Sequence, residues 1–414
     1  MDLSRVMVRS LLLGSTLALA AWSTAAGAHE YSVAQKRALA VEGKRAPGSP
    51  ARAAAAVSAR TADTFTVLHS FAGAPDDGSG SGAEVTLGPS GSLFGTTDYG
   101  GANTYGTLFE IDGNGTESIL HSFGATGDGS TPDGAAFLDK STLYGTTTYG
   151  GSSENGVIWK FGIYSNYSVL HNFTVDECNF ARGKLVQDKK GNFYATCLFG
   201  GANEDGTVIE FTQKGKVTVL HNFTGDDGEF PEHGVVMDKD GNLYGVTAFG
   251  GASDDGAIYE IARDGTFTTL YSFTGGADGG FLYGGLAIDK DGNLYGSADD
   301  GGANGDGTVF EFSAAGTFSV LYNFTGGADG SFPEGDMLLM GKNLYSTTTE
   351  GGANSEGTVY QVSLKGKEKT LADFSDTNGN YYSAGLTPSG KTFYGTTEFG
   401  GASDNGTVFS LTKN

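Results

Sequence analysis

The sequence predicts an all-β fold: a seven-bladed β-propeller with four antiparallel strands per blade. Three observations predict it. A motif recurs at near-constant spacing, glycines alternate with runs of strand-forming residues, and the order of the strands allows the two ends of the array to join. Together these patterns are typical of short strands and tight turns repeated around a central axis.

The repeated motif contains a Gly-Gly pair, a polar loop and a third glycine before a strand-like run. "YGGANTYGTLFEI" (99–111) is one copy and "FGGASDNGTVFSL" (399–411) is the last, and the first glycine of the pair stands at positions 100, 150, 200, 250, 301, 351 and 400. A period of about 50 residues indicates a repeat architecture. A phosphate-binding loop would need a helix after the glycines, and no helical periodicity follows them.

One repeat unit, residues 284–324, reads as four strands. The first covers 285–288, and the turn "DKDGN" leads to the second at 294–298. The Gly-Gly loop comes next, then a third strand at 308–312, the turn "SAAG" and a fourth strand at 317–324. Four antiparallel strands repeated radially make a propeller blade.

The ends of the array predict how the ring closes. The domain opens at Thr64 with a lone fourth strand, "TFTVLHSF", and stops at Leu411 on a third strand. The N-terminal strand is therefore expected to complete the last blade in a three-plus-one closure. A β-solenoid or open array would need capping repeats, and the sequence shows none. We assign residues 63–414 to the propeller.

The first 62 residues differ from the rest. Arg5 and Arg9 precede a short apolar stretch, and Ala26-Gly27-Ala28 forms an A-x-A cleavage site, so 1–28 is predicted to be a bacterial secretory signal peptide. Residues 29–62 are rich in alanine and arginine and are predicted to be a flexible linker. We expect an exported protein, periplasmic or extracellular, with no membrane span.

Charge and cysteine content narrow the possible partners. The net charge of −23 argues against nucleic acid as a partner. The two cysteines, Cys178 and Cys197, are expected to form a disulfide in an oxidising compartment, with a pair of buried free thiols as the alternative. No metal site is expected from two cysteines alone. We expect a monomer.

The pattern "LYGTT-x-[YF]-GGA-x-x-x-GTVF" resembles the GloVer repeat of the choice-of-anchor tandem-repeat proteins, over roughly residues 64–414. The pattern "GGLAID-x-DGNLYG" is also similar to the NHL propeller repeat. The resemblance implies an exported propeller and no established activity. Many proteins of that family carry a C-terminal surface anchor. This sequence stops at Asn414 without one, so we expect release or periplasmic retention.

Candidate binding residues are sought where the repeat is broken. Unequal residues at the start of each first strand would face one mouth of the central channel; they are Glu84, Asp133, Arg182, His233, Tyr283, Glu334 and Tyr382. The Gly-Gly loops would surround the same mouth with Tyr105, Glu154, Glu204, Asp205, Asp254, Asp255, Asp306 and Glu356. Such a rim suits a sugar, a cation or a basic peptide. The alternative is a rim that is simply solvated.

Equivalent residues in several blades are interpreted as structural. His69, His121, His171 and His221 share one repeat position on outer strands, too far apart to bind one metal. The "DKDGN" segments at 238–242 and 289–293 faintly resemble a calcium loop but lack its later acidic ligands, so we favour turn formation. No cofactor is expected, and calcium has only weak support. The small residue after the aromatic of each second strand is expected to receive a side chain from the neighbouring blade.

Two functions remain open. The first is a non-catalytic binding or interaction module for a polysaccharide or a protein. The alternative is a glycan-active hydrolase or lyase at the channel mouth, for which His233, Glu334, Tyr283 and Arg182 are the candidate catalytic residues. A hydrolase would need two carboxylates about 5–10 Å apart inside a pocket.

Overall fold

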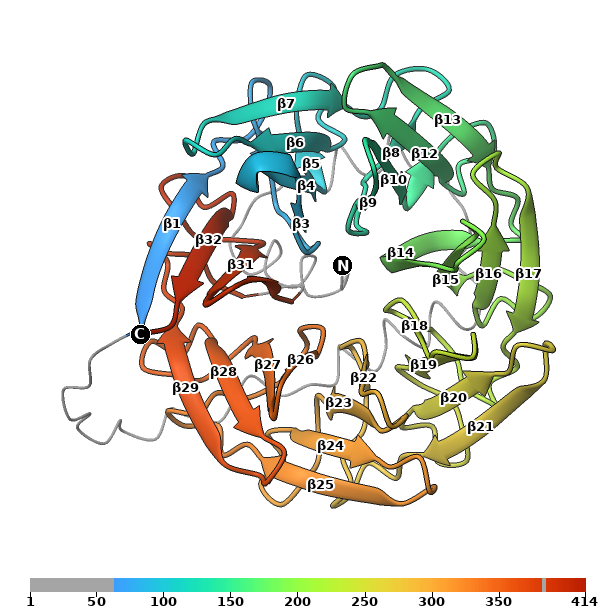
Figure 1. Cartoon of the computed structure of the whole chain (residues 1–414), viewed down its shortest axis with the longest axis vertical. Helices are drawn as coiled ribbons and strands as arrows, with labels where there is room; N and C mark the ends of the chain where they lie inside the picture. Colours follow the sequence, from blue (N-terminus) through green and yellow to red (C-terminus); the bar gives the residue numbers. More distant parts are fainter. Residues whose placement is uncertain (1–62, 382–384) are drawn as a thin grey trace, which may run out of the picture. The chain divides into compact units, whose positions relative to one another are not determined.

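The structure is a computed structural model that describes residues 63–381 and 385–414. The predicted signal peptide (1–28) and linker (29–62) lie outside these residues. The described part forms seven four-stranded antiparallel sheets that stand as blades around a channel, as predicted (Figure 1). Within it, no helix has the length and apolar character needed to cross a membrane.

Blades 1 to 3 succeed one another along the chain. Blade 1 contains β3 (Thr86–Leu87), β4 (Leu93–Thr97), β6 (Thr107–Ile111) and β7 (Glu117–Ser122). Blade 2 contains β9 (Phe137–Asp139), β10 (Thr142–Thr146), β12 (Val157–Gly162) and β13 (Tyr167–Asn172). Blade 3 contains β14 (Asn179–Gln187), β15 (Phe193–Phe199), β16 (Thr207–Phe211) and β17 (Val217–Asn222).

Blades 4 to 6 repeat the plan with first strands of two or three residues, as in blades 1 and 2. Blade 4 contains β18 (Val236–Met237), β19 (Leu243–Thr247), β20 (Ala257–Ile261) and β21 (Phe267–Ser272). Blade 5 contains β22 (Ala287–Ile288), β23 (Leu294–Ala298), β24 (Thr308–Phe312) and β25 (Phe318–Asn323). Blade 6 contains β26 (Leu338–Met340), β27 (Asn343–Thr348), β28 (Thr358–Ser363) and β29 (Glu368–Asp373).

Blade 7 joins the two ends of the propeller. It contains β30 (Thr387–Ser389), β31 (Thr392–Thr397), β32 (Thr407–Thr412) and, outermost, β1 (Thr64–Ser70). β1 pairs antiparallel with β32, from Thr64 opposite Thr412 to Ser70 opposite Thr407. The three-plus-one closure predicted from the sequence is confirmed, and it replaces a free edge with ladder hydrogen bonds.

Short elements supplement the blades on one face. β2 (Gly78–Ser79) pairs with β5 (Tyr99–Gly100), and β8 (Gly129–Ser130) pairs with β11 (Tyr149–Gly150). Among the described residues, one 3₁₀ turn, η1 (Pro89–Gly91), lies at the opposite end, in the hairpin between β3 and β4. The small sheets fix the Gly-Gly loops of blades 1 and 2 against the connections that lead into those blades.

The core explains the small residue of each second strand, and it corrects one expectation. Gly145 lies opposite Trp159 of the adjacent strand in the same blade, and a Cβ added at Gly145 would stand 2.3 Å from the indole ring. Gly245 faces Tyr259 in the same way. The ring that covers the glycine therefore belongs to the partner strand, not to the neighbouring blade. Where the partner is the smaller Ile209, the position accommodates Ala195.

The outer edge of the ring is nearly identical from blade to blade. Its histidines bond an acid in the connection that follows, at 2.8–3.0 Å: His69 with Asp77, His121 with Asp128, His171 with Glu177 and His221 with Asp227. In blades 4 and 5 a tyrosine takes that place, Tyr271 with Asp278 and Tyr322 with Asp329. Each pair anchors its own connection, which agrees with the structural interpretation of these histidines.

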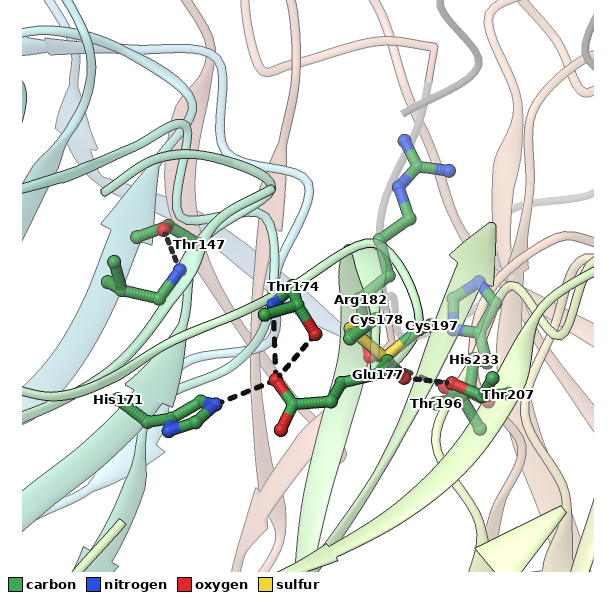
Figure 2. The surroundings of a disulfide bond; sticks show 11 residues. Thr147, His171, Thr174, Glu177, Cys178, Arg182, Thr196, Cys197, Thr207 and His233 are labelled. Carbon is green, nitrogen blue, oxygen red and sulfur yellow. Dashed lines mark hydrogen bonds and ion pairs between the residues drawn. A yellow bond between two sulfur atoms is a disulfide. The ribbon is translucent and has the colours of Figure 1, made fainter. Parts of the chain in front are cut away.

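Blade 3 departs from the repeat. A disulfide joins Cys178, just before β14, to Cys197 in β15, with the Cα atoms 5.3 Å apart (Figure 2). Both cysteines are fully buried in the core between blades 2 and 3. The bridge ties the longest first strand of the ring to its partner, beside the channel-facing Arg182.

Candidate functional site

Strand pairing defines the levels of the channel. The first-strand residues Thr86, Phe137, Val186, Val236, Ala287, Leu338 and Thr387 each lie opposite the aromatic of the second strand, so they occupy equivalent places. These first-strand residues serve as reference positions. Four predicted residues share one level because each precedes the reference residue of its own blade by four positions: Asp133, Arg182, Tyr283 and Glu334. His233 precedes its reference residue by three positions, and Glu84 by two. The six of these residues that the structure describes therefore lie at three levels of the channel.

The upper level holds an arginine between two carboxylates. Arg182 Nε donates to Asp133 Oδ2 at 2.5 Å, and its Nη1 donates to Glu232 Oε2 at 2.5 Å. Asp133 comes from the connection into blade 2, and Glu232 from the connection into blade 4. The Arg182 side chain is only 7% exposed. This ion triad links three successive blades at the mouth of the channel, where a buried charge must be paired.

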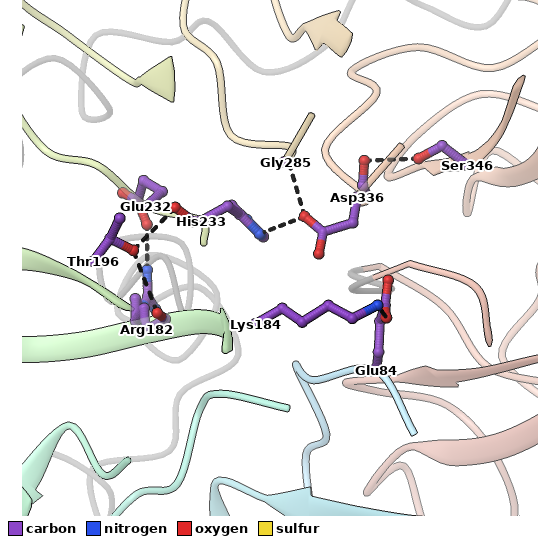
Figure 3. Close-up of polar contacts among 10 residues, drawn as sticks. Glu84, Arg182, Lys184, Thr196, Glu232, His233, Gly285, Asp336 and Ser346 are labelled. Atoms are coloured by element: carbon purple, nitrogen blue, oxygen red, sulfur yellow. Dashed lines mark hydrogen bonds and ion pairs between the residues drawn. The ribbon is translucent and has the colours of Figure 1, made fainter. Parts of the chain in front are cut away.

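The lower level holds a second group of charges that cross the channel (Figure 3). Lys184 Nζ bonds Glu84 Oε2 at 2.6 Å, and His233 Nδ1 lies 2.8 Å from Asp336 Oδ1. The same Asp336 oxygen accepts the backbone N–H of Gly285 at 2.7 Å. The charges come from blades 1, 3, 4 and 6, so this network ties opposite sides of the ring together.

These contacts shift the pKa values of the four groups. Burial raises the pKa of Glu84, and Lys184 only partly offsets it. The Glu84 carboxylate raises the pKa of Lys184. Burial alone would lower the pKa of His233, but the charge and hydrogen bond of Asp336 outweigh it and leave that pKa raised. The pKa of Asp336 is lowered: burial opposes this, but His233 and Lys184 prevail. His233 and Asp336 therefore behave as an ion pair.

A cavity of about 250 Å³ lies beside the lower level. It is lined mainly by apolar groups of the first strands, with Glu84 and Lys184 at its polar end; the other lining residues are Val85, Thr86, Leu87, Ala135, Ala136, Phe137, Leu138 and Thr387. It falls just below the 300–1,000 Å³ typical of small-molecule sites. Its lining holds one carboxylate, so it lacks the carboxylate pair that a glycosidase needs.

Another buried acidic side chain, Asp98, directly follows β4. Asp98 is 1% exposed, and neither carboxylate oxygen has a hydrogen-bond partner among the described residues. Burial raises the pKa of Asp98 well above its usual range, and the charges of Asp133 and Glu398 raise it further. Burial and the neighbouring charges therefore favour the uncharged form of this carboxyl group.

The two faces of the propeller differ in charge. Because the strands alternate in direction, the Gly-Gly loops and the connections between blades lie at one end, here called the Gly-Gly face. Those segments contain no lysine or arginine except Arg182 and Lys184 in the channel. The hairpins at the opposite end, the hairpin face, carry Lys140, Lys189, Lys190, Lys214, Lys239, Arg263, Lys290, Lys342, Lys365 and Lys391.

Acids crowd one sector of the Gly-Gly face. Burial raises the pKa of Asp255, and the charges of Asp254, Asp278 and Asp300 raise it further. Asp306 shows the same pattern: burial raises its pKa first, and the charges of Asp329, Asp300 and Glu350 add to this. The field over blades 4 to 6 is therefore negative enough to oppose ionisation of its own carboxyl groups. The predicted rim residues Asp205 and Glu356 stand at the equivalent loop position, while Glu154 and Glu204 are exposed one residue earlier.

The other predicted site residues are placed less centrally. Glu334 is buried on the upper level, and Tyr283 is half-buried there. Tyr105 is 41% exposed in the Gly-Gly loop of blade 1. Tyr382 lies outside the described residues. The structure thus brings Arg182 against Asp133 and His233 against Asp336.

Three channel residues were missed by sequence reasoning: Lys184, Glu232 and Asp336. The positions of Lys184 and Asp336 hold alanine or glycine in four of the other blades, such as Ala135 and Gly285, so no repeated charge marks them, whereas Glu232 shares the level of Asp133 and Arg182. The buried apolar residue that follows at the next position, Leu185 for Lys184 and Met337 for Asp336, is the signal that would have aligned them.

The "DKDGN" segments form turns. Asp238 Oδ1 accepts the backbone N–H groups of Asp240, Gly241 and Asn242 at 2.8–2.9 Å. Asp289 accepts those of Asp291 and Asn293 at 2.9 Å. These bonds show the turn formation that the sequence analysis favoured.

Comparison with known proteins supports the repeat and the fold. The family model of the Gloeobacter/Verrucomicrobia repeat matches residues 49–247 and 231–414. A search of curated proteins found no significant match.

Solved structures of low identity share the propeller fold. Two extracellular domains from B. thetaiotaomicron, described as parts of a hybrid two-component system and a one-component system, align with TM-scores of 0.55 and 0.53 at 12% identity. The alignments cover 85% and 84% of this chain but only 40% of each of those chains. A gluconolactonase from Xanthomonas campestris aligns with a TM-score of 0.44 at 11% identity, over 84% of this chain and 89% of that chain.

Proposed function

The chain belongs to the Gloeobacter/Verrucomicrobia repeat family, and we propose that its propeller is an exported, non-catalytic binding module for a positively charged polymer. The polymer is a polysaccharide bearing amino groups or a basic protein segment. The observation that carries this proposal is the charge difference between the two faces: acids gather on the Gly-Gly face, where the loops lack lysine and arginine.

Electrostatics supports a cationic ligand. The carboxyl groups of Asp255 and Asp306 have raised pKa values, in part because neighbouring acids repel their charge. An approaching cation would relieve that repulsion, and a negative field raises the rate of association with cations. The exposed ring of Tyr105 on this face could stack on a sugar or lie against a cationic side chain.

The paired charges in the channel are better suited to holding the shape of its mouth than to catalysis. Arg182, Lys184 and His233 are each engaged by carboxylates, and the cavity lining contains one carboxylate. Paired charges hold the mouth in one shape, whereas a general acid or nucleophile needs a reacting group within reach. A glycan-active enzyme remains the second candidate that the experiment must address.

The experiment mixes the protein with chitosan, poly-lysine, neutral cellulose and polygalacturonate, and measures depletion of protein and release of reducing sugar ends. We expect chitosan and poly-lysine to deplete the protein, with binding that weakens as salt increases, and no sugar release. The relative affinities of chitosan and poly-lysine distinguish a polysaccharide from a protein ligand. Equal binding to all four polymers, or none, would overturn the proposal. Sugar release would make the protein an enzyme.

A matched pair of tyrosines separates specific contact from general attraction. Tyr105 lies on the Gly-Gly face, and Tyr164, 89% exposed, lies in a hairpin at the other end of blade 2. Tyr105→Ala is expected to weaken binding about tenfold, and Tyr164→Ala to leave it unchanged, because a cation held over an aromatic ring contributes about 0.5–2 kcal/mol. Equal effects would assign the binding to bulk charge.

A further inference from the structure

A distinct cluster of metal-ligating groups lies on the outer edge of the ring. His69 of β1, Asp77 of the connection into blade 1 and Glu117 at the start of β7 each present one donor atom, all within 4.8 Å of one another. β1 belongs to blade 7 and β7 to blade 1, so the cluster spans the seam where the two ends of the propeller join. It shares no residue with the channel.

The repeat supplies an internal comparison for this cluster. The place of Glu117 opposite its third strand is taken by Tyr167, Val217, Phe267, Phe318, Glu368 and Phe65 in the other blades. Two of these rings stack on the preceding blade's histidine: Tyr167 on His121 and Phe267 on His221, with centroids 3.8 and 3.6 Å apart. Glu368 faces a tyrosine, Tyr322, instead. Among the described blades, only the seam combines a histidine with two carboxylates.

One carboxylate oxygen of the cluster makes no hydrogen bond to the described residues. Asp77 Oδ2 accepts from the backbone N–H of Ala72 at 2.8 Å and lies 3.0 Å from His69 Nε2. Glu117 Oε1 is shielded from water and has no hydrogen-bond partner among the described residues. Burial raises the pKa of Glu117, and the charge of Asp77 raises it further. Two carboxylates this close repel each other, and a cation bound between them would relieve that repulsion.

We propose that His69, Asp77 and Glu117 bind one divalent transition-metal ion of the zinc class. One imidazole nitrogen and two carboxylate oxygens form a donor set that zinc accepts at about 2.0–2.2 Å, with water in the fourth position. Ligand atoms held by one zinc ion at those distances stand about 3.3–3.6 Å apart, so donor atoms that are now as much as 4.8 Å apart must move closer together when the ion binds. His69 binds through its Nε2 lone pair, so its ring proton resides on Nδ1. The two carboxylates balance the charge of the ion.

The ion would link blade 7 to blade 1, the two blades whose contact closes the ring. It joins the N-terminal strand, which is held in blade 7 by β32, to the outer strand of blade 1. A ligand that binds only the folded state stabilises it by RT ln(1 + [L]/Kd), so the effect grows with the concentration of free ligand. Zinc is therefore expected to raise the unfolding temperature of this protein.

The test titrates the full chain, purified without a histidine tag, with Zn²⁺ by isothermal calorimetry, with Mn²⁺ and Ca²⁺ as comparison ions. We expect one equivalent of Zn²⁺ per chain and a higher unfolding temperature in its presence. Glu117→Gln keeps the size of the side chain and is expected to weaken Zn²⁺ binding at least tenfold and to abolish the thermal shift. His69→Ala is expected to do the same.

The equivalent contact between blades 1 and 2 provides the control and the converse test. His121→Ala removes an equivalent histidine and is expected to leave the stoichiometry and affinity for Zn²⁺ unchanged. Tyr167→Glu places a carboxylate beside His121 and Asp128 and is expected to create a second Zn²⁺ equivalent. Absence of Zn²⁺ binding by the unaltered chain would overturn the proposal. So would binding that survives Glu117→Gln, or binding that His121→Ala removes.

Discussion

The outer edge and the channel are built from the same repeat yet differ in what the repeat preserves. On the outer edge, a histidine or tyrosine bonds an acid in six blades, and the aromatic two residues later is buried each time. In the channel, equivalent positions hold Glu84, Lys184 and Asp336 in three blades and alanine or glycine in the others. The edge is uniform, and the channel is not.

This difference shows which contacts depend on symmetry. The outer strands pack blade on blade, so every blade must present the same shape to its neighbours. The channel is where seven first strands converge, and a charge from one blade can be neutralised by a charge from another. Ion pairs such as Lys184 with Glu84 need only complementary partners across the ring, so the residues can diverge.

Breaking the repeated core is expected to have the largest effect. Trp159 is fully buried, packs over Gly145 and donates its indole N–H to the Thr146 carbonyl at 3.1 Å. Trp159→Ala would leave a cavity and is expected to lower the free energy of unfolding by about 4 kcal/mol. Urea unfolding measures it. A loss below about 1 kcal/mol would mean that the blades tolerate voids and that symmetry is not required for packing.

Breaking the upper channel triad should cost somewhat less. Arg182→Met removes the guanidinium that bridges the mostly buried carboxylates of Asp133 and Glu232. We expect a loss of about 3 kcal/mol, because breaking a buried ion pair leaves uncompensated charge. The triple variant Arg182→Met, Asp133→Asn, Glu232→Gln should recover most of that loss in the same urea experiment. If the triple variant is as unstable as Arg182→Met, the effect arises from lost packing and not from charge.

Removing the disulfide tests why blade 3 differs from the others. Cys178 and Cys197 are separated by 19 residues, and closing a loop of that size contributes about 3 kcal/mol. The double substitution Cys178→Ala, Cys197→Ala is expected to lower stability by about 2–4 kcal/mol. Dithiothreitol should destabilise the unaltered chain but not the variant. An equal response of both to dithiothreitol would show that the bridge does not form.

The smallest expected effect is a gain, and it depends on pH. The pKa of Asp98 in the folded chain is raised above the usual value of about 3.9 for an aspartate, so the unfolded chain releases this proton at lower pH than the folded chain. Stability therefore falls as the pH rises from about 4 through the folded pKa. Asp98→Asn should be more stable than the unaltered chain at pH 7 by about 1–2 kcal/mol, and the difference should vanish near pH 4. A constant difference across pH would exclude titration of Asp98.

The fold was predictable because its determinants are local and repeated. The seven Gly-Gly pairs, the turns after Asp238 and Asp289 and the lone strand at Thr64 define the blades and their closure without reference to distant contacts. The site was less predictable. Arg182 and Asp133 were found as unequal residues, but Lys184 and Asp336 were missed because connections of unequal length shift the alignment of the first strands. The metal cluster could not be inferred, since Glu117 becomes significant only once blade 7 lies beside blade 1.

The most direct test of the account compares matched charge variants of the two faces. One variant carries Asp254→Asn, Asp255→Asn and Asp306→Asn on the Gly-Gly face, and the other Asp240→Asn, Asp264→Asn and Asp291→Asn on the hairpin face. Both have the same net charge. In the polymer-binding assay, we predict that the first variant loses cationic polymer binding at least tenfold and the second binds like the unaltered chain. Equal loss in both would contradict the assignment of function to the Gly-Gly face.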